Sequence, residues 1–385
     1  MTYKQVATML NNTLVPNMLG EGTIIADDLS NLVDLGTAIA NVTADQLKDY
    51  TADFVSGVVK IWLDERVFSK NINRLYRDYE EFGGIVQRVK SGLMEVTDDV
   101  STNLQNGTSY DQDTFIGFDM NNKVYTMDAG FELDWSIPHN MWKVAFSSPV
   151  ELMRLIGYIG NRAEQSVRAN VYALQLATVR KMILTHASGR VKLLKIYNDT
   201  YNSGAGATRL TAAEAETDAA FLRWAVEQII LTKAALRDIS AVNNDGTIVT
   251  FDNAEDIDMI LLTKFSNDIK IHMQSDVYHT DLVDIGEYEE LNYIQNRGTQ
   301  KLPDISTCGE IKETVGTGQS AVTTHIEKFV ACVYSKYAAG ITTHAEKVTS
   351  HYNAKGDFTN YFRRCPARYY VDSRENTVVF TLEDE

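Results

Sequence analysis

The pattern of hydrophobic and polar positions changes period near residue 148, where a strand-like run gives way to a long helical one. Apolar residues recur every three or four positions after Pro149, and no further proline occurs before Gly189. Ser148 stands at an N-cap position, Pro149 where a missing N–H costs nothing, and Glu151 where it would complete a capping box. The pattern predicts one helix, the spine helix, from Pro149 to Ala187, roughly 60 Å long at about 1.5 Å per residue.

Two strand-like runs precede this helix, and a long polar segment separates them. The runs cover residues 83–96 and begin again at 123, and the segment between them is rich in Asp, Asn, Gly, Ser and Thr. A polar excursion of this length inside a compact domain is usually functional. We therefore predict a projecting two-stranded arm with its loop at about 96–123. A single hairpin buries too little apolar surface to be stable alone, so the arm is expected to pack against a neighbouring chain.

The remaining patterns predict the other regions of the chain. Residues 1–63 contain short helical patterns and are interpreted as an N-terminal arm, followed by the strand and extended loop in 64–147. Residues 190–345 resemble a separate α+β domain with a helix at 217–238. Within 346–385, the sequence ARYYVDSRENTVVF predicts two strands around a turn. We expect this C-terminal run to return to a small sheet beside the spine helix.

Composition and charge exclude some classes of protein. The chain has 385 residues, enough for two or three subdomains, and a formal net charge of -16. No window approaches the apolar length of a membrane span, so no membrane partner is expected. DNA-binding proteins neutralise many phosphates with clustered basic residues, which this sequence lacks. Its three cysteines are widely spaced, which favours free thiols in a reducing compartment.

Residues with the spacing of a catalytic or metal site are not found. A group of carboxylates lacks the spacing of a calcium loop and is interpreted as a solvated acidic helix start: Asp252, Glu255, Asp256 and Asp258. The GAGAT sequence from Gly204 lacks the lysine of a phosphate loop and predicts a hinge. The longest basic cluster is interpreted as part of two surface strands: Arg363, Arg364 and Arg368. We expect no catalytic residues, no cofactor and no metal.

The order of strand, projecting arm, returning strand and long helix, over residues 54–187, resembles the major capsid proteins of tailed phages. Among these it is most similar to the head proteins of small short-tailed phages, and the helix–strand–helix order of 210–303 follows the same family. The resemblance implies an α+β phage capsid (Johnson) fold. That fold would comprise an N-terminal arm (1–63), an extended loop region (64–147), a peripheral domain with the spine helix (148–189), an axial domain (190–345) and a C-terminal return to the peripheral domain (346–385).

This resemblance implies a structural protein that self-assembles, as hexamers and pentamers, into an icosahedral head enclosing double-stranded DNA. It would be assembled in the host cytoplasm and reside in the virion. Expected partners are a portal and decoration proteins, with a separate scaffolding protein or none, because the N-terminus lacks a long charged helical segment. The expected subunit-interface residues are Trp62 in the N-terminal arm and four residues of the projecting arm: Asn103, Tyr110, Phe115 and Phe118.

The acidic composition implies that DNA is held by confinement, with few phosphate contacts per subunit. The exceptions would be two basic groups, if either faces inward: Arg180 with Lys181, and Arg66 with Lys70 and Arg74. Two alternative functions stay open. One is the shell of an encapsulin-type nanocompartment, which encloses an enzyme; the other is a cytoplasmic α+β enzyme with its site in 190–345. The long N-terminal arm favours the phage head, and the missing catalytic residues count against the enzyme.

Overall fold

The structure of the chain is a computed structural model. It describes residues 3–13, 24–41, 72–75, 86–93, 99–110, 113, 115, 117, 120–125, 129–204, 206–246, 248–273, 286–294, 308–315, 322–343 and 346–384. Trp62 and Phe118 lie outside these residues, as do Arg66 and Lys70.

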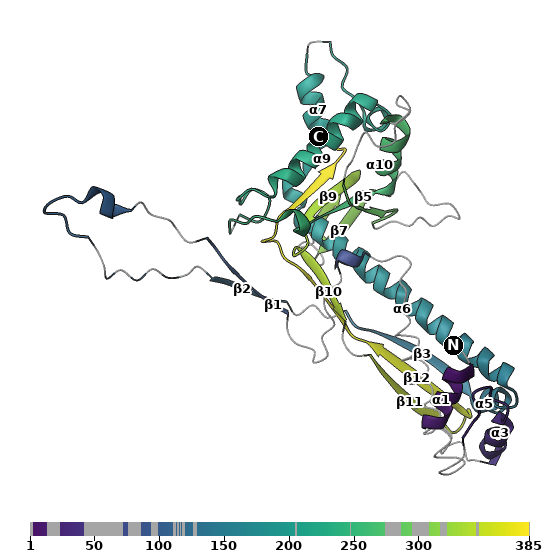
Figure 1. Cartoon of the computed structure of the whole chain (residues 1–385). Coiled ribbons are helices and arrows are strands. Elements are labelled where there is room, and N and C mark those ends of the chain that lie inside the picture. The colour runs from purple at the N-terminus through teal and green to yellow at the C-terminus, as the bar shows by residue number, and fades with distance from the viewer. Residues whose placement is uncertain are drawn as a thin grey trace.

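The longest element is the spine helix α6 (Pro149–Thr185), which comprises 37 residues and continues through Gly157 and Gly160. In Figure 1 it runs diagonally through the body of the molecule. The Ser148 hydroxyl accepts a hydrogen bond from the Val150 N–H at 3.2 Å, which satisfies one of the free donors at the helix start. The predicted helix is confirmed as a single element that ends two residues before the expected position.

The predicted capping box at the start of α6 is not formed. The Glu151 carboxylate pairs with Arg154 at 2.8 Å, one turn further along the exposed face, and the Ser148 side chain caps through the second helical residue. An ion pair at this spacing is a common alternative for a glutamate in the first turn. The helix therefore begins with a one-sided cap.

The first half of α6 packs on a three-stranded antiparallel sheet with the order β11-β12-β3. Its strands are β11 (Lys347–Asn353), β12 (Phe358–Cys365) and β3 (Phe131–Pro138). The buried core on this side is completed by α1 (Tyr3–Thr13), α3 (Leu32–Asn41) and α5 (His139–Ala145). Trp142 and Phe146 lie at its centre. The expected return of the C-terminal chain to a sheet beside the spine helix is observed for β11 and β12.

The second half of α6 packs into a larger core built around a five-stranded sheet. The strand order is β4 (Val191–Lys192), β14 (Thr377–Thr381), β9 (Phe329–Ser335), β5 (Ile257–Leu262) and β6 (Glu289–Leu291). Every residue of β5, β9 and β14 is buried, as expected for strands covered on both faces. Helix α9 (Ala219–Ala235) packs against β9. The predicted helix at 217–238 is thus observed as α9, which begins two residues later and ends three residues earlier.

The two strands on either side of residues 372–376 go to different sheets. β13 (Ala367–Val371) pairs with β10 (Ala339–Thr343), whereas β14 lies between β4 and β9. The segment 346–385 was expected to return as one piece to the peripheral sheet, and β14 differs from that expectation. Its sequence TVVFT is fully buried, which suits an interior strand covered on both faces better than a sheet with one exposed face.

The projecting arm begins as a ribbon of two antiparallel strands, β1 (Val86–Ser91) and β2 (Met120–Tyr125). The ribbon leaves the body, and the short 3-10 helix η2 (Val100–Asn103) lies near its far end (Figure 1). Since Ser91 pairs with Met120, the connecting segment is 92–119 rather than the expected loop at 96–123. The polar residues at the start of β2 are not typical of a strand, so the sequence did not predict that β2 begins at Met120.

The remaining elements are short. They are η1 (Asn73–Leu75), η3 (Ala187–Gly189), α7 (Leu193–Tyr201), α8 (Ala212–Ala215), η4 (Ala254–Asp256), α10 (Thr263–Asp268), the π-helical η5 (Ile269–Met273), β7 (Ile311–Val315) and β8 (Val322–Ile326). None of the described helices combines the length and apolarity needed to cross a bilayer.

The interpretation of the carboxylates after residue 251 as a solvated helix start holds for Glu255, which is exposed in η4, but is wrong for Asp252 and Asp258. Asp252 is buried and accepts hydrogen bonds from Ser335 at 2.6 Å and Asn376 at 2.8 Å. Asp258 is buried and pairs with Arg74. Their partners are distant in sequence, which is why the local pattern looked unpaired. Within the described residues, no group of three or more His, Cys, Asp or Glu side chains is placed to hold a metal ion.

The basic cluster on β12 contains one buried residue. Arg363 is 1% exposed, and its Nε donates to Glu346 Oε2 at 2.8 Å. Its Nη2 also lies 3.8 Å from Glu164 of α6, so the guanidinium joins the sheet to the spine helix. The next residue, Arg364, is exposed and pairs with Glu132 at 2.6 Å. Both arginines are paired, but the expected surface position is observed only for Arg364, because Arg363 is buried.

This difference predicts unequal effects of two neighbouring substitutions. Arg363→Met should lower the free energy of unfolding by about 3 kcal/mol, because it removes a buried guanidinium and leaves the largely buried Glu346 carboxylate without its cation. The matched control Arg364→Met should change it by less than about 1 kcal/mol, because an exposed pair contributes little. Urea unfolding of the unassembled chain measures both values. Equal losses in the two variants would contradict the structural role given to Arg363.

Candidate assembly interface

The projecting ribbon has two chemically different faces. Side chains of a strand alternate between faces, and along β1 and β2 half-buried positions alternate with exposed ones. The body-facing side carries cations, including Arg88 opposite Lys123. Like charges placed directly opposite each other destabilise a strand pair. The ribbon therefore needs counter-charges from elsewhere in the chain.

The turn at 372–376 supplies these counter-charges. Arg374 is 2% exposed and holds the turn together, donating to Asp372 from Nε at 2.9 Å and from Nη2 at 2.8 Å. Its third nitrogen, Nη1, donates to the backbone oxygen of Asn121 at 2.9 Å and to the side-chain oxygen at 3.1 Å. The bidentate geometry orients the guanidinium and links the turn to β2.

The cations of β1 bind the carboxylates of the same turn. Arg88 lies 2.8 Å from Glu375 Oε1 and 3.3 Å from Asp372 Oδ2, and Lys90 lies 2.9 Å from Glu375 Oε2. We call the five residues Arg88, Lys90, Asp372, Arg374 and Glu375 the root clamp. Both of its carboxylates are buried, so the clamp fixes the ribbon at the base of the arm.

Aromatic rings and a serine complete the base of the arm. The Arg88 guanidinium lies over the rings of Tyr370 and Tyr337, at 5.5 Å and 5.7 Å from their centroids. Such cation–π contacts add stability where the cation is partly desolvated. Ser373 donates to Asp245 at 2.8 Å, which ties the turn to the loop after α9. The arm is therefore held by charge and rings rather than by an apolar core.

The pKa of Asp372 reflects this arrangement. Burial opposes ionisation of the carboxyl group, but hydrogen bonds from Arg374 and the charges of Arg374 and Arg88 outweigh burial and lower the pKa to about 2. The carboxylate is thus ionised at neutral pH. The nearby Tyr125 hydroxyl has a raised pKa because it is buried and faces the negative charge of Asp372.

The outward face of the ribbon is exposed, and each apolar side chain on it lies opposite a polar one: Val124 and Gln87, Val89 and Asn122, Met120 and Ser91. Val89, Met120 and Val124 are each about half exposed or more, and they lie on the face opposite the root clamp. A two-stranded ribbon with apolar side chains open to water is only marginally stable alone.

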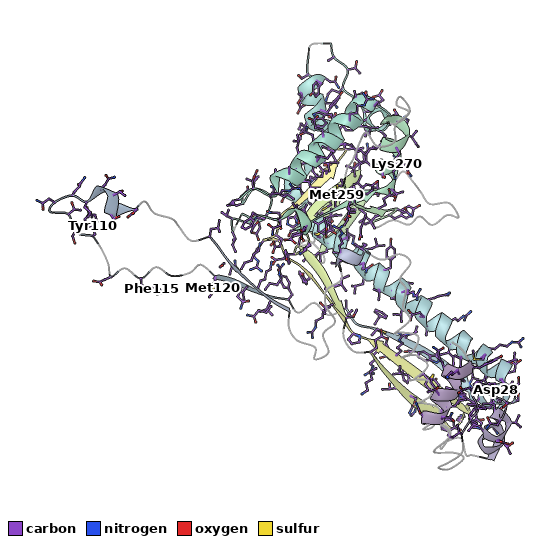
Figure 2. The ribbon with its side chains drawn as sticks, in the orientation of Figure 1. Asp28, Tyr110, Phe115, Met120, Met259 and Lys270 are labelled. Carbon is purple, nitrogen blue, oxygen red and sulfur yellow. The ribbon has the colours of Figure 1, made fainter. Side chains whose placement is uncertain are left out.

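Three of the predicted interface residues are described, and they lie along the arm beyond the ribbon. Asn103 ends η2 and is exposed. The Tyr110 hydroxyl accepts a hydrogen bond from the Gln105 N–H at 2.8 Å, so this ring shapes the loop of the arm itself. Phe115 is 92% exposed and lies between Tyr110 and Met120 on the returning limb (Figure 2). Trp62 and Phe118 fall outside the described residues, so all five assignments stay predictions.

Sequence reasoning missed the root clamp entirely. Its two halves are separated by more than 280 residues, as in the Arg88–Asp372 pair. The available signal was the density of charge in DSREN, a turn between two apolar strands. A turn with this many charges next to buried strands needs partners, and the cations of β1 were candidates.

Comparison with known proteins identifies a family and a fold. The family model for the Phi29-like phage major capsid protein matches residues 12–381. The capsid structure of Staphylococcus phage Andhra is similar with a TM-score of 0.51 and 11% identity, covering 83% of this chain and 87% of that one. The capsid structure of the Cyanophage P-SCSP1u gives a TM-score of 0.45 and 13% identity, covering 83% and 92%. No curated protein sequence matches the chain.

The lowered pKa of Asp372 predicts a dependence of stability on pH. A carboxyl group with a depressed folded-state pKa contributes stability above its unfolded value, near 3.8, and loses it as the pH falls toward about 2. We expect this contribution to be about 1–2 kcal/mol. Asp372→Asn should therefore unfold more easily than the parent at pH 7, with the difference shrinking below about pH 4. Urea unfolding across this range measures it.

The exposed Asp113 provides the control, since Asp113→Asn removes a carboxylate from the arm without touching the root clamp. That variant should unfold like the parent at pH 7. A constant difference between Asp372→Asn and the parent from pH 7 to pH 2.5 would show that the carboxylate charge is not what stabilises the arm base.

Proposed function

Because the chain belongs to the Phi29-like phage major capsid protein family, we propose that its projecting arm joins subunits of the phage head as they assemble into hexamers and pentamers. The family and the fold establish a structural subunit that self-assembles into the shell of the virion. The observation that carries the finer proposal is the β1–β2 ribbon, which is fixed by charge at its base and exposes apolar side chains beyond it.

Because its base is fixed, the arm is already oriented before it contacts another subunit. An arm that pivoted freely would lose orientational entropy on every contact, whereas a preoriented arm has already lost it during folding. Each contact is small, but a closed shell repeats it in every subunit, so stability depends on assembly and concentration. In this proposal α6 and the three-stranded sheet form a peripheral domain, residues 190–345 an axial domain and residues 1–63 an N-terminal arm.

We also propose that the head encloses double-stranded DNA by confinement, with few phosphate contacts per subunit. Two of the basic residues suggested as exceptions have other partners: Arg74 pairs with Asp258 and Glu287, and Lys181 lies over the Tyr369 ring at 5.7 Å. A portal, scaffolding or decoration proteins, and assembly in the host cytoplasm belong to the same proposal. The family match favours this function over a nanocompartment shell or an enzyme.

The arm proposal predicts the result of a deletion. Removal of residues 103–119 should leave a folded chain that fails to form closed shells, because the root clamp and both cores remain while the contacting segment is lost. Circular dichroism and urea unfolding check the fold, and electron microscopy with light scattering checks assembly.

A deletion of residues 203–206, from the loop after α7, serves as the matched control. It shortens an exposed loop far from the arm in sequence and should leave assembly intact. If the chain without 103–119 still forms closed shells of normal size, the arm is not an assembly element.

The confinement proposal predicts weak binding of DNA by the unassembled subunit. Counterion release makes affinity high and steeply salt-dependent only when many phosphates are neutralised together. Fluorescence anisotropy with random-sequence duplex at physiological salt should therefore show dissociation constants of about 10⁻⁶ M or weaker. Sub-micromolar binding with a steep salt slope would contradict it.

A further inference from the structure

The projecting arm contains a tight turn at 105–108, close to Tyr110 near its far end (Figure 2). The Thr108 N–H donates to the Gln105 oxygen at 3.3 Å, and Gly107 has a φ of +86°. These values define a type II turn, whose third residue needs a positive φ that glycine reaches without strain. Asn106 stands directly before this glycine, and the sequence Asn-Gly occurs only here in the chain.

The Asn106–Gly107 pair is open to water. All four residues of the turn are exposed. None of the described residues accepts a hydrogen bond from the Gly107 N–H. A Cβ atom added at Gly107 would meet no other atom within 4 Å. The main-chain nitrogen of Gly107 is therefore neither engaged nor shielded by the described part of the chain.

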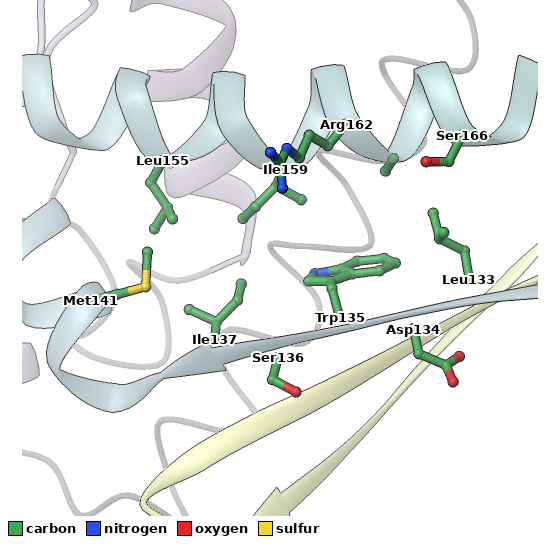
Figure 3. Close-up of a pocket in the computed structure, with 11 residues that line it drawn as sticks. Leu133, Asp134, Trp135, Ser136, Ile137, Met141, Leu155, Ile159, Arg162 and Ser166 are labelled. Carbon is green, nitrogen blue, oxygen red and sulfur yellow. The ribbon is translucent and has the colours of Figure 1, made fainter. Parts of the chain in front are cut away.

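The body of the subunit does not cover this turn. An apolar groove of about 460 Å³ lies between α6 and β3, lined by Trp135 and Ile137 of β3 and by Leu155 of α6 (Figure 3). The arm projects away from this groove and from the rest of its own chain (Figure 1). The turn is therefore exposed in an unassembled subunit whose arm keeps the direction that the root clamp gives it.

An asparagine before a glycine can lose its side-chain amide without an enzyme. The deprotonated nitrogen of Gly107 attacks Cγ of Asn106, the Cγ–Nδ2 bond breaks, and the nitrogen leaves as ammonia. Water then opens the resulting succinimide ring at either of its carbonyl carbons, which gives aspartate or isoaspartate. Glycine favours ring formation because it lacks a Cβ and reaches backbone conformations closed to other residues.

A second pair with the same ring-forming chemistry is held in place. In Asp245–Gly246, the Gly246 N–H donates to Asn244 Oδ1 at 2.7 Å. The Asp245 carboxylate accepts a hydrogen bond from Ser373 at 2.8 Å. The attacking nitrogen and the side chain that it would attack are thus both engaged. This pair provides an internal comparison for the turn of the arm.

We propose that Asn106 is a site of spontaneous deamidation, and that subunits modified there assemble less readily. The reaction adds a negative charge to the connecting segment 92–119, which already contains six Asp or Glu and no Lys or Arg. In the isoaspartyl form the main chain is also one carbon longer, so the 105–108 hydrogen bond loses its geometry. The Gln105 N–H, which donates to the Tyr110 hydroxyl at 2.8 Å, belongs to the same turn. The effect on assembly rests on the proposed role of the arm, whereas the chemical change does not.

Peptide mapping of the unassembled chain tests the chemistry. During incubation at mildly alkaline pH, aspartyl and isoaspartyl forms should accumulate at 106, and mildly acidic pH should slow them because the attacking nitrogen must lose its proton. Gly107→Ala should slow the reaction by about tenfold or more, since a Cβ restricts the backbone. Asp245 should show no isoaspartate in the same samples, and a sample digested without incubation gives the background.

Chromatography with mass spectrometry separates and measures these forms. An unmodified Asn106 after prolonged incubation would overturn the proposal. Equal rates in the parent and in Gly107→Ala would also overturn it, because the reaction would then not pass through the ring.

Comparison of fresh and incubated subunits tests the effect on assembly. The incubated parent should need a severalfold higher concentration to form shells than the fresh parent, as measured by light scattering and electron microscopy. Gly107→Ala incubated for the same time should assemble like its own fresh sample, which controls for other changes during incubation. Equal threshold concentrations for the fresh and the modified parent would overturn the effect on assembly.

Assembled shells give a readout that needs no substitution. If contacts with a neighbour hold the arm, Asn106 should be modified more slowly in shells than in unassembled subunits incubated in parallel. Equal rates would show that assembly leaves the turn open, and would count against the effect on assembly. If the chain without 103–119 still forms closed shells while Asn106 is modified in the parent, the role of the arm fails and the modification site stands.

Discussion

The arm depends on charge at its base because it has no core of its own. Strands β1 and β2 bury little apolar surface, and their body-facing cations would repel one another without the carboxylates of the 372–376 turn. Buried ion pairs gain little net stability against apolar replacements, since desolvation offsets much of the attraction. They do restrict geometry, because bidentate hydrogen bonds from Arg374 tolerate few orientations. In this chain the root clamp therefore fixes the orientation of the projecting arm, which apolar packing alone would not do.

The orientation of the arm is fixed only if the rest of the chain is rigid, and α6 provides that rigidity. Its first half contributes Leu152 and Ile156 to one core, and its second half contributes Val179 and Ile183 to the other. A continuous helix resists bending far better than a linker would, so the two cores keep a fixed separation. The 372–376 turn is joined to the same frame, because β14 directly after it lies inside the five-stranded sheet. The base of the arm is thus connected to α6 through the 372–376 turn and the five-stranded sheet.

Some elements of this structure could be predicted from the sequence more closely than others. The spine helix follows from signals within a few residues, namely Ser148, Pro149 and the periodicity after them, and so its limits could be predicted closely. The position of β14 depends on pairing with β9, which is more than 40 residues away. A strand-like sequence does not show which strand it will pair with. The root clamp and the burial of Asp252 were missed for the same reason. The exposed aromatic residues of the arm, Tyr110 and Phe115, could be suggested from the sequence because they stand within a polar segment.

The uneven distribution of charge links assembly to the handling of DNA. A subunit with a net charge of -16 is repelled by its own copies at long range, so association relies on local complementarity that acts within about a Debye length of 8–10 Å. Most cations of the spine helix already have partners inside the chain: Arg154 pairs with Glu151, Arg168 pairs with Glu164, and Lys181 lies over the Tyr369 ring. Cations that are engaged within the subunit are less available to neutralise phosphate. This internal pairing supports the proposal that the enclosed DNA is held by confinement.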